Sequence, residues 1–364
     1  MKALLSHDLP RSKLLSLLLI LTVAGLALAP FIFPGIKALN VAAKVLIFIV
    51  LVASYDLLLG YTGIVSFAHT MFFGIGAYGI AISSSRMGPG WDAVGLGLAA
   101  ALGLSLLLSL VIGLFSLRVK AIFFAMITLA VASAFVTLAS QLSELTGGED
   151  GLTFKVPEAL QPATEYLEEP FLGAMIDGRF LSYYLLFFSV LALVLLMLRI
   201  VNSPFGRVLQ AIRENEFRAE AIGYRTVVYR TLSNVLAALF ATCAGALLAL
   251  WLRYSGPDTS MSFEIMLDIL LIVVIGGMGT IYGAVIGSAL FVLAQNYLQD
   301  LMRLGEGAVA GIPVLSQLVS PDRWLLWLGV LFVLSVYHFP TGIVGRLRLG
   351  ALLRNNKRLK EARR

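Results

Sequence analysis

Cysteine and histidine are scarce in this 364-residue chain, and their positions exclude several kinds of site. The single cysteine, Cys243, lies inside an apolar run, so the chain has neither a disulfide framework nor a cysteine-rich metal site. The three histidines are far apart, and none lies in an H-E-x-x-H pattern. No lysine follows a glycine, so the G-K-[ST] phosphate loop of nucleotide-hydrolysing proteins is absent as well.

Charge is equally scarce. Only 13% of the residues are charged, which is about half the charged fraction of an ordinary soluble protein, and 59% are hydrophobic. The mean hydropathy is +0.92, and long apolar runs recur along the chain. A helical membrane span needs about 20 such residues. The composition therefore predicts an all-α polytopic membrane protein with about ten transmembrane helices, including broken or re-entrant ones.

The expected spans follow from the apolar runs. The first run, 14–33, follows three basic residues, as in a cleavable signal peptide. However, it is longer than the apolar part of a signal peptide, and it continues past the small residues Ala27-Leu28-Ala29, where cleavage would occur. We therefore interpret it as a retained helix. The remaining runs are 45–59, 65–84, 93–117, 121–142, 181–198, 232–252, a divided run at 265–297, and 324–339.

The charges between the runs predict an orientation. Segment 143–180 holds eight acids and two bases, so we expect an external acidic loop there. Segment 199–230 carries six arginines, and the tail 346–364 carries eight basic residues, so both are expected in the cytoplasm together with residues 1–13. This topology also explains the net charge of +6 without a nucleic-acid partner. With both termini in the cytoplasm, the chain must cross the membrane an even number of times. The divided run must therefore enter and leave the membrane on the outer side.

Glycine clusters interrupt two apolar regions in opposite halves of the chain, at 60–76 and at 276–283. Because glycine costs about 1 kcal/mol per helical position relative to alanine, both predict broken helices. Breaks in corresponding halves indicate an internal repeat and a substrate path near mid-membrane. The alternative is close helix packing, which suits single glycines such as Gly103 and Gly245 better. The residues expected near the path are Thr62, Ser66, His69, Gly277 and Thr280.

Ionisable residues in or beside the spans are the other costly feature, since charges in hydrocarbon face a cavity or a partner. A coupling-ion or proton relay would use Asp56, His69 and Asp268, as in an ion-coupled secondary transporter. The alternative, which we favour, is that each group is satisfied locally. The full set is Lys44, Asp56, His69, Glu264 and Asp268. A membrane-embedded enzyme is disfavoured because no nucleophile–base pair or metal cluster is present in the sequence.

The segment 203–230 reads as a cytoplasmic loop with a short amphipathic helix. Its apolar residues recur near helical spacing among charges, Pro204 can start the helix and Gly223 can end it. The alternative to an amphipathic helix is a solvated connector, which would carry the same charged residues.

This loop also resembles the cytoplasmic loop of ABC-importer permeases of the branched-chain amino-acid family, of the LivM-like rather than the LivH-like half. Further segments resemble that family in the same order, over about residues 40–345. They are LLLGYTGIVSFAHTMFFGIGAYG (57–79), FFAMITLA (123–130), LTGGEDGL (145–152), SGPDTSMSF (255–263) and VVIGGMGTIYGAVIGSAL (273–290).

The resemblance implies a permease domain, 14–345, in a bacterial inner membrane, with no catalytic site and no cofactor of its own. Its implied partners are membrane lipid, a homologous LivH-like permease subunit, a solute-binding protein and two ATPase subunits that bind ATP and magnesium. Branched-chain or related hydrophobic amino acids are the implied cargo, with urea, short amides or aromatic acids as alternatives. Ala68 stands where the family often has glycine. The implied ATPase-coupling residues are Arg213, Glu214, Arg218, Glu220, Ala221 and Gly223, with Ile212 and Ile222 as apolar anchors.

Overall fold

The computed structural model describes residues 13–32, 35–116, 121–167, 175–309, 320–338 and 342–347. The expected N-terminal segment, except Lys13, and the basic tail beyond residue 347 therefore lie outside the described residues. The long helices are α1 (Lys13–Ile32), α2 (Ile36–Thr62), α3 (His69–Met87), α4 (Trp91–Ser116), α5 (Ala121–Gln141), α7 (Gly178–Val201), α10 (Thr226–Leu252), α12 (Phe263–Gly276), α13 (Ile281–Val309) and α15 (Trp324–His338).

Shorter elements connect these helices. They are α6 (Ser143–Thr146), β1 (Leu152–Thr153), α8 (Pro204–Glu214), α9 (Glu216–Ala221), β2 (Tyr254–Ser255), α11 (Pro257–Ser260) and the 3₁₀ turns Gly148–Asp150, Glu158–Leu160 and Pro321–Arg323. Among the described residues, eight helical stretches are long and apolar enough to cross a membrane. The chain is thus an all-α polytopic membrane protein, as its composition predicts.

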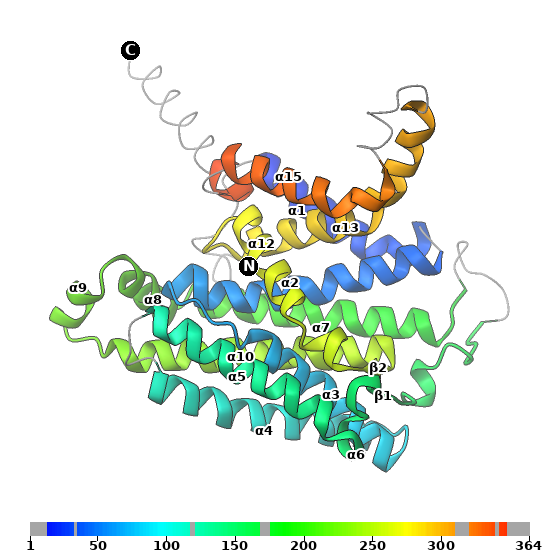
Figure 1. The fold of residues 1–364 in the computed structure, drawn as a ribbon, viewed down its shortest axis with the longest axis horizontal. Coiled ribbons are helices and arrows are strands. Elements are labelled where there is room, and N and C mark those ends of the chain that lie inside the picture. The colour runs from blue at the N-terminus through cyan, green and yellow to red at the C-terminus, as the bar shows by residue number, and fades with distance from the viewer. Residues whose placement is uncertain are drawn as a thin grey trace.

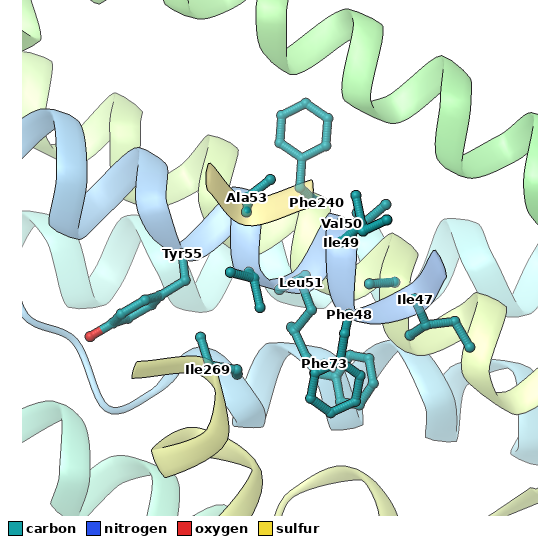
Figure 2. Packing of buried hydrophobic residues seen from close by; sticks show 14 of the residues in the cluster. Ile47, Phe48, Ile49, Val50, Leu51, Ala53, Tyr55, Phe73, Phe240 and Ile269 are labelled. Atoms are coloured by element: carbon teal, nitrogen blue, oxygen red, sulfur yellow. The ribbon is translucent and has the colours of Figure 1, made fainter. Parts of the chain in front are cut away.

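Helix α2 forms the centre of the bundle. It is buried along almost its whole length and packs against α7, α10, α12 and α13. Figure 2 shows Ile47, Phe48 and Leu51 of α2 among Phe73 of α3, Phe240 of α10 and Ile269 of α12. Peripheral helices such as α4, α5 and α15 instead carry rows of exposed large apolar side chains. In a membrane protein such side chains face lipid or another subunit, because hydrocarbon is as apolar as leucine.

Glycine determines how closely α3 and α10 approach each other. A Cβ on Gly76 would overlap the carbonyl oxygen of Thr242, and a Cβ on Gly245 would overlap the carbonyl oxygen of Phe73. These two helices therefore touch through their backbones, as small residues allow in membranes. The packing interpretation of Gly245 is confirmed, whereas a Cβ on Gly103 would have no neighbour within 4 Å. Gly76 belongs to the first glycine cluster, yet it lies inside α3 and breaks no helix.

The two polar segments lie at opposite ends of the bundle. Figure 1 shows α8 and α9 at one end, and α6, β1 and β2 at the other. At the second end the acidic segment pairs with the end of α10, where β1 and β2 form an antiparallel ladder with Leu152 opposite Ser255. These strands have two residues each, and no alternating apolar pattern indicates them in the sequence. We call the end with α8 and α9 the loop end, and the opposite end the far end.

Candidate functional site

Both glycine-rich interruptions are breaks between helices. Helix α2 ends at Gly63, which adopts the left-handed conformation (φ 72°), and residues 63–68 form no helix before α3 begins. Helix α12 is followed by Gly277 and Gly279, with φ of 114° and 80°. Only glycine adopts such angles at little cost, so the glycines fix the positions of both breaks. The divided run therefore forms two helices, separated by residues 277–280.

The two breaks meet at the loop end through the buried carboxylate of Asp56. Its Oδ1 accepts a hydrogen bond from the backbone N–H of Gly279 at 2.8 Å, and its Oδ2 accepts one from Thr280 at 2.8 Å. A Cβ on Gly60 would overlap Asp56 Oδ1 and the backbone nitrogen of Gly279. Asp56 thus caps the start of α13 from another helix, because the first N–H groups of a helix lack partners within it.

Arg213 connects the segment 203–230 to this junction. Its guanidinium, at the end of α8, donates a hydrogen bond to the carbonyl oxygen of Gly60. A Cβ on Gly342 would overlap Gly277, so the helical segment 342–347 reaches the same place. A movement of α8 would therefore act directly on the end of α2, and through Asp56 on the start of α13.

The residues expected near the substrate path divide into two groups. Gly277 and Thr280 lie at the junction, where Thr280 Oγ1 donates to the Gly277 carbonyl at 2.8 Å. Thr62, Ser66 and His69 lie around the first break and are almost completely buried. Thr62 Oγ1 donates to Leu58 O within its own helix, and Ser66 Oγ accepts from the backbone of Ala68. Their role along a path stays a prediction.

His69 is enclosed by protein between α2 and α3. Its Nε2 lies 2.9 Å from Ser54 Oγ and 3.2 Å from the carbonyl oxygen of Leu51, and its ring meets the ring of Tyr55 edge-on at a centroid distance of 5.2 Å. Asp56 is likewise paired, with backbone N–H groups, and Asp268 accepts from the side chain of Gln295 at 3.3 Å. All three groups proposed for an ion relay thus have local partners, which supports the local interpretation. In the part of the chain that the structure describes, no three histidine, cysteine or acidic side chains gather as metal ligands.

The segment 203–230 forms two helices where one was expected. Pro204 lies in the first turn of α8, as predicted. Asn215 then interrupts the helix in an extended conformation, and its side chain accepts the N–H of Arg218 at 3.0 Å to cap α9. Asparagine is among the strongest N-cap residues, so this break had a signal in the sequence. Gly223, with φ of 98°, ends the loop helices as predicted.

All six expected coupling residues are exposed, and two of them also form hydrogen bonds within the chain. Glu214 and Arg218 are exposed, as are Ala221 and Gly223. Arg213 turns back to Gly60, and Glu220 accepts a hydrogen bond from Thr226 Oγ1 at 2.7 Å, at the start of α10.

One of the two expected apolar anchors differs from the expectation. Ile212 is buried within the chain, at 2% exposure, so its expected role as an anchor is wrong. Ile222 is 67% exposed, and Phe217 is 86% exposed. The sequence analysis missed Phe217 because this residue lies among charged residues and outside the apolar spacing of the loop. Phe217 and Ile222 are thus large apolar side chains exposed on α9 and at its end.

Comparisons with known proteins agree with this architecture. The model of a family described as "Branched-chain amino acid transport system / permease component" matches residues 37–336. The high-affinity branched-chain amino acid transport system permease proteins LivM of Salmonella typhimurium and Escherichia coli are each 26% identical to this chain, covering 79% of it and 70% and 69% of their own lengths. The probable branched-chain amino acid transport permease protein LivM of Methanocaldococcus jannaschii is 27% identical, covering 69% of both chains. No solved structure matches the chain significantly.

Proposed function

The chain belongs to the family of permease components of branched-chain amino acid transport systems, and from this premise we propose that it forms half of the translocation pathway of an ABC importer. Its cargo is leucine, isoleucine or valine, released by an external binding protein. A homologous permease subunit supplies the other half of the pathway. Two cytoplasmic ATPase subunits supply the energy, since the sequence contains no phosphate loop of its own.

The relatives give the main support for this cargo. All three LivM relatives carry the name of a branched-chain amino acid permease. None is named for urea, short amides, aromatic acids or ion-coupled transport. Branched-chain amino acids are therefore the first substrates to test, and the local partners of Asp56, His69 and Asp268 favour no ion relay.

The energy coupling is proposed to act through α8 and α9. The side chains of Phe217 and Ile222 are exposed there, as are the charged side chains of Glu214 and Arg218. A groove in the ATPase subunit would bury the two apolar side chains, in the manner of a helix bound in a groove. The hydrogen bond from Arg213 to Gly60 would then carry movement of the docked helices to the junction of the two breaks.

The proposed orientation follows from the same arrangement. The six arginines of 199–230 belong to the loop end, and basic loops stay in the cytoplasm. The loop end would therefore lie in the cytoplasm of a bacterial inner membrane, and the acidic segment at the far end would meet the binding protein outside. Both termini are proposed to lie in the cytoplasm.

Uptake in cells tests the proposed function. The chain is expressed with the permease, ATPase and binding-protein genes of its own genome in a host that lacks leucine importers. We expect uptake of radiolabelled leucine that competes with isoleucine and valine, and that is lost when any one gene is left out. Uptake that persists without the ATPase genes would contradict the proposal, as would a complete set of subunits that assembles and imports none of the three amino acids.

A further inference from the structure

A cavity of about 760 Å³ lies between α2, α10, α12 and α13 in the half of the bundle next to the far end. Its lining includes the polar side chains of Lys44, Asp268 and Gln295 and the apolar side chains of Phe48, Phe73 and Trp251. Lys44 lies eight residues into α2, which places it about 12 Å from the start of that helix. The volume lies within the range of about 300–1,000 Å³ that is usual for small-molecule sites.

One hydrogen-bonded chain joins these three polar side chains. Lys44 Nζ donates to Gln295 Oε1 at 2.9 Å, and Gln295 Nε2 donates to Asp268 Oδ2 at 3.3 Å. The amide orientation follows from chemistry, because an ammonium group can only donate and a carboxylate can only accept. Glu264 lines the cavity one helical turn from Asp268 and adds negative charge on the same side. A cation and an anion within a span thus face each other through a neutral amide.

We propose that this cavity binds an α-amino acid with an apolar side chain as it passes through the permease; the inference rests on the proposed function above. The substrate carboxylate takes the place of Gln295 Oε1 at Lys44, and the substrate ammonium takes the place of Gln295 Nε2 at Asp268. The side chain of the substrate packs against Phe48, Phe73 and Trp251. In the empty cavity Gln295 holds the positions of both substrate groups.

The chemistry of the lining selects the ligand class. An α-amino acid carries an acceptor and a donor on adjacent atoms, as the amide of Gln295 carries them on one carbon. A metal ion or another cation would pair with Asp268 but would be repelled by Lys44. A 2-oxo acid would keep the contact with Lys44 and lose the contact with Asp268. The cavity therefore distinguishes a zwitterion from either charge alone.

Protection of a cysteine in the cavity tests this binding site. Asn40 lines the cavity and is exposed, so Asn40→Cys in a Cys243→Ser background gives a label position for a membrane-impermeant maleimide. The assembled importer is placed in nanodiscs without binding protein, and the leucine concentration that halves the labelling rate is measured. We expect leucine to slow labelling, and the 2-oxo analogue of leucine to need at least about a tenfold higher concentration.

Three further variants distinguish binding from simple structural support. Lys44→Met and Asp268→Asn should each raise the protective leucine concentration about 10- to 100-fold, since each removes a charged partner of the substrate. Gln295→Ala should leave that concentration unchanged or lower it, because it removes the group that competes with the substrate. In Asp268→Asn the preference for leucine over its 2-oxo analogue should disappear. All values are compared for equal amounts of assembled complex.

The outcomes separate this site from the proposed function. Unprotected labelling in a complex that imports leucine would overturn the cavity assignment and leave the function standing. A Gln295→Ala variant that weakens protection as much as Lys44→Met would also overturn it, because the three side chains would then be only structural. In a third outcome, the complex does not import leucine, and leucine does not slow the labelling, but another amino acid does. This outcome would support the cavity as a binding site and contradict the branched-chain cargo.

Discussion

The cap that Asp56 provides can be tested by replacing its side chain. Asp56→Ala leaves the backbone N–H groups of buried Thr280 and half-buried Gly279 without the carboxylate that they bond to at 2.8 Å. A buried unpaired donor costs about 1–3 kcal/mol, so losing both should destabilise the permease by about 4 kcal/mol. Asp56→Asn keeps one acceptor oxygen and turns the other into a donor, so it should lose roughly half as much.

The measurement is the apparent melting temperature of the purified importer. At about 2 °C per kcal/mol, Asp56→Ala should melt about 8 °C below the wild-type protein and Asp56→Asn between the two. Asp92→Ala is the matched control, because Asp92 is an aspartate in the first turn of a helix, α4, but is exposed. Its loss should cost less than about 1 kcal/mol. Equal melting temperatures for Asp56→Ala and Asp92→Ala would refute the stabilising role of the cap.

Three further predictions concern coupling, orientation and packing. Phe217→Asp should reduce the ATPase subunit that co-purifies with the permease at least tenfold, because it places a charge on the proposed apolar docking surface; the exposed control Gln210→Asp on α8 should not. A cysteine at Glu165 should react with an impermeant maleimide in intact cells, and one at Gln210 only after permeabilisation; the reverse pattern would overturn the proposed orientation. Gly76→Leu should lower the amount of assembled permease severalfold, since the side chain would overlap the backbone of α10, whereas Gly103→Leu has open space and should assemble normally.

The sequence predicts local structure well here. Apolar runs locate the membrane helices because a span must be apolar along about 20 residues. The glycines at 63, 277 and 279 locate the breaks because the backbone there needs positive φ. Pro204 and Gly223 bound the loop helices for similar local reasons. Each of these signals is read from residues next to one another in the chain.

The partners across the fold could not be read in this way. Asp56 stands out as a charge within a span, but its partners are backbone N–H groups more than 220 residues away, and backbone groups leave no mark in a sequence. Gln295 is an ordinary polar residue until the fold brings it between Lys44 and Asp268. Ile212 was expected on the docking surface because apolar spacing gives a helix face and not the direction in which that face points.

The source of energy for leucine transport is the most direct test of the proposed function. The complete importer is reconstituted in proteoliposomes with its ATPase sites outward, ATP is supplied outside, and leucine-loaded binding protein is enclosed within. We predict that leucine leaves the vesicles only while ATP is hydrolysed, and that the movement is unaffected when proton and sodium gradients are collapsed. Leucine movement that follows an ion gradient and continues without ATP would contradict the assignment of this chain as an ABC-importer permease.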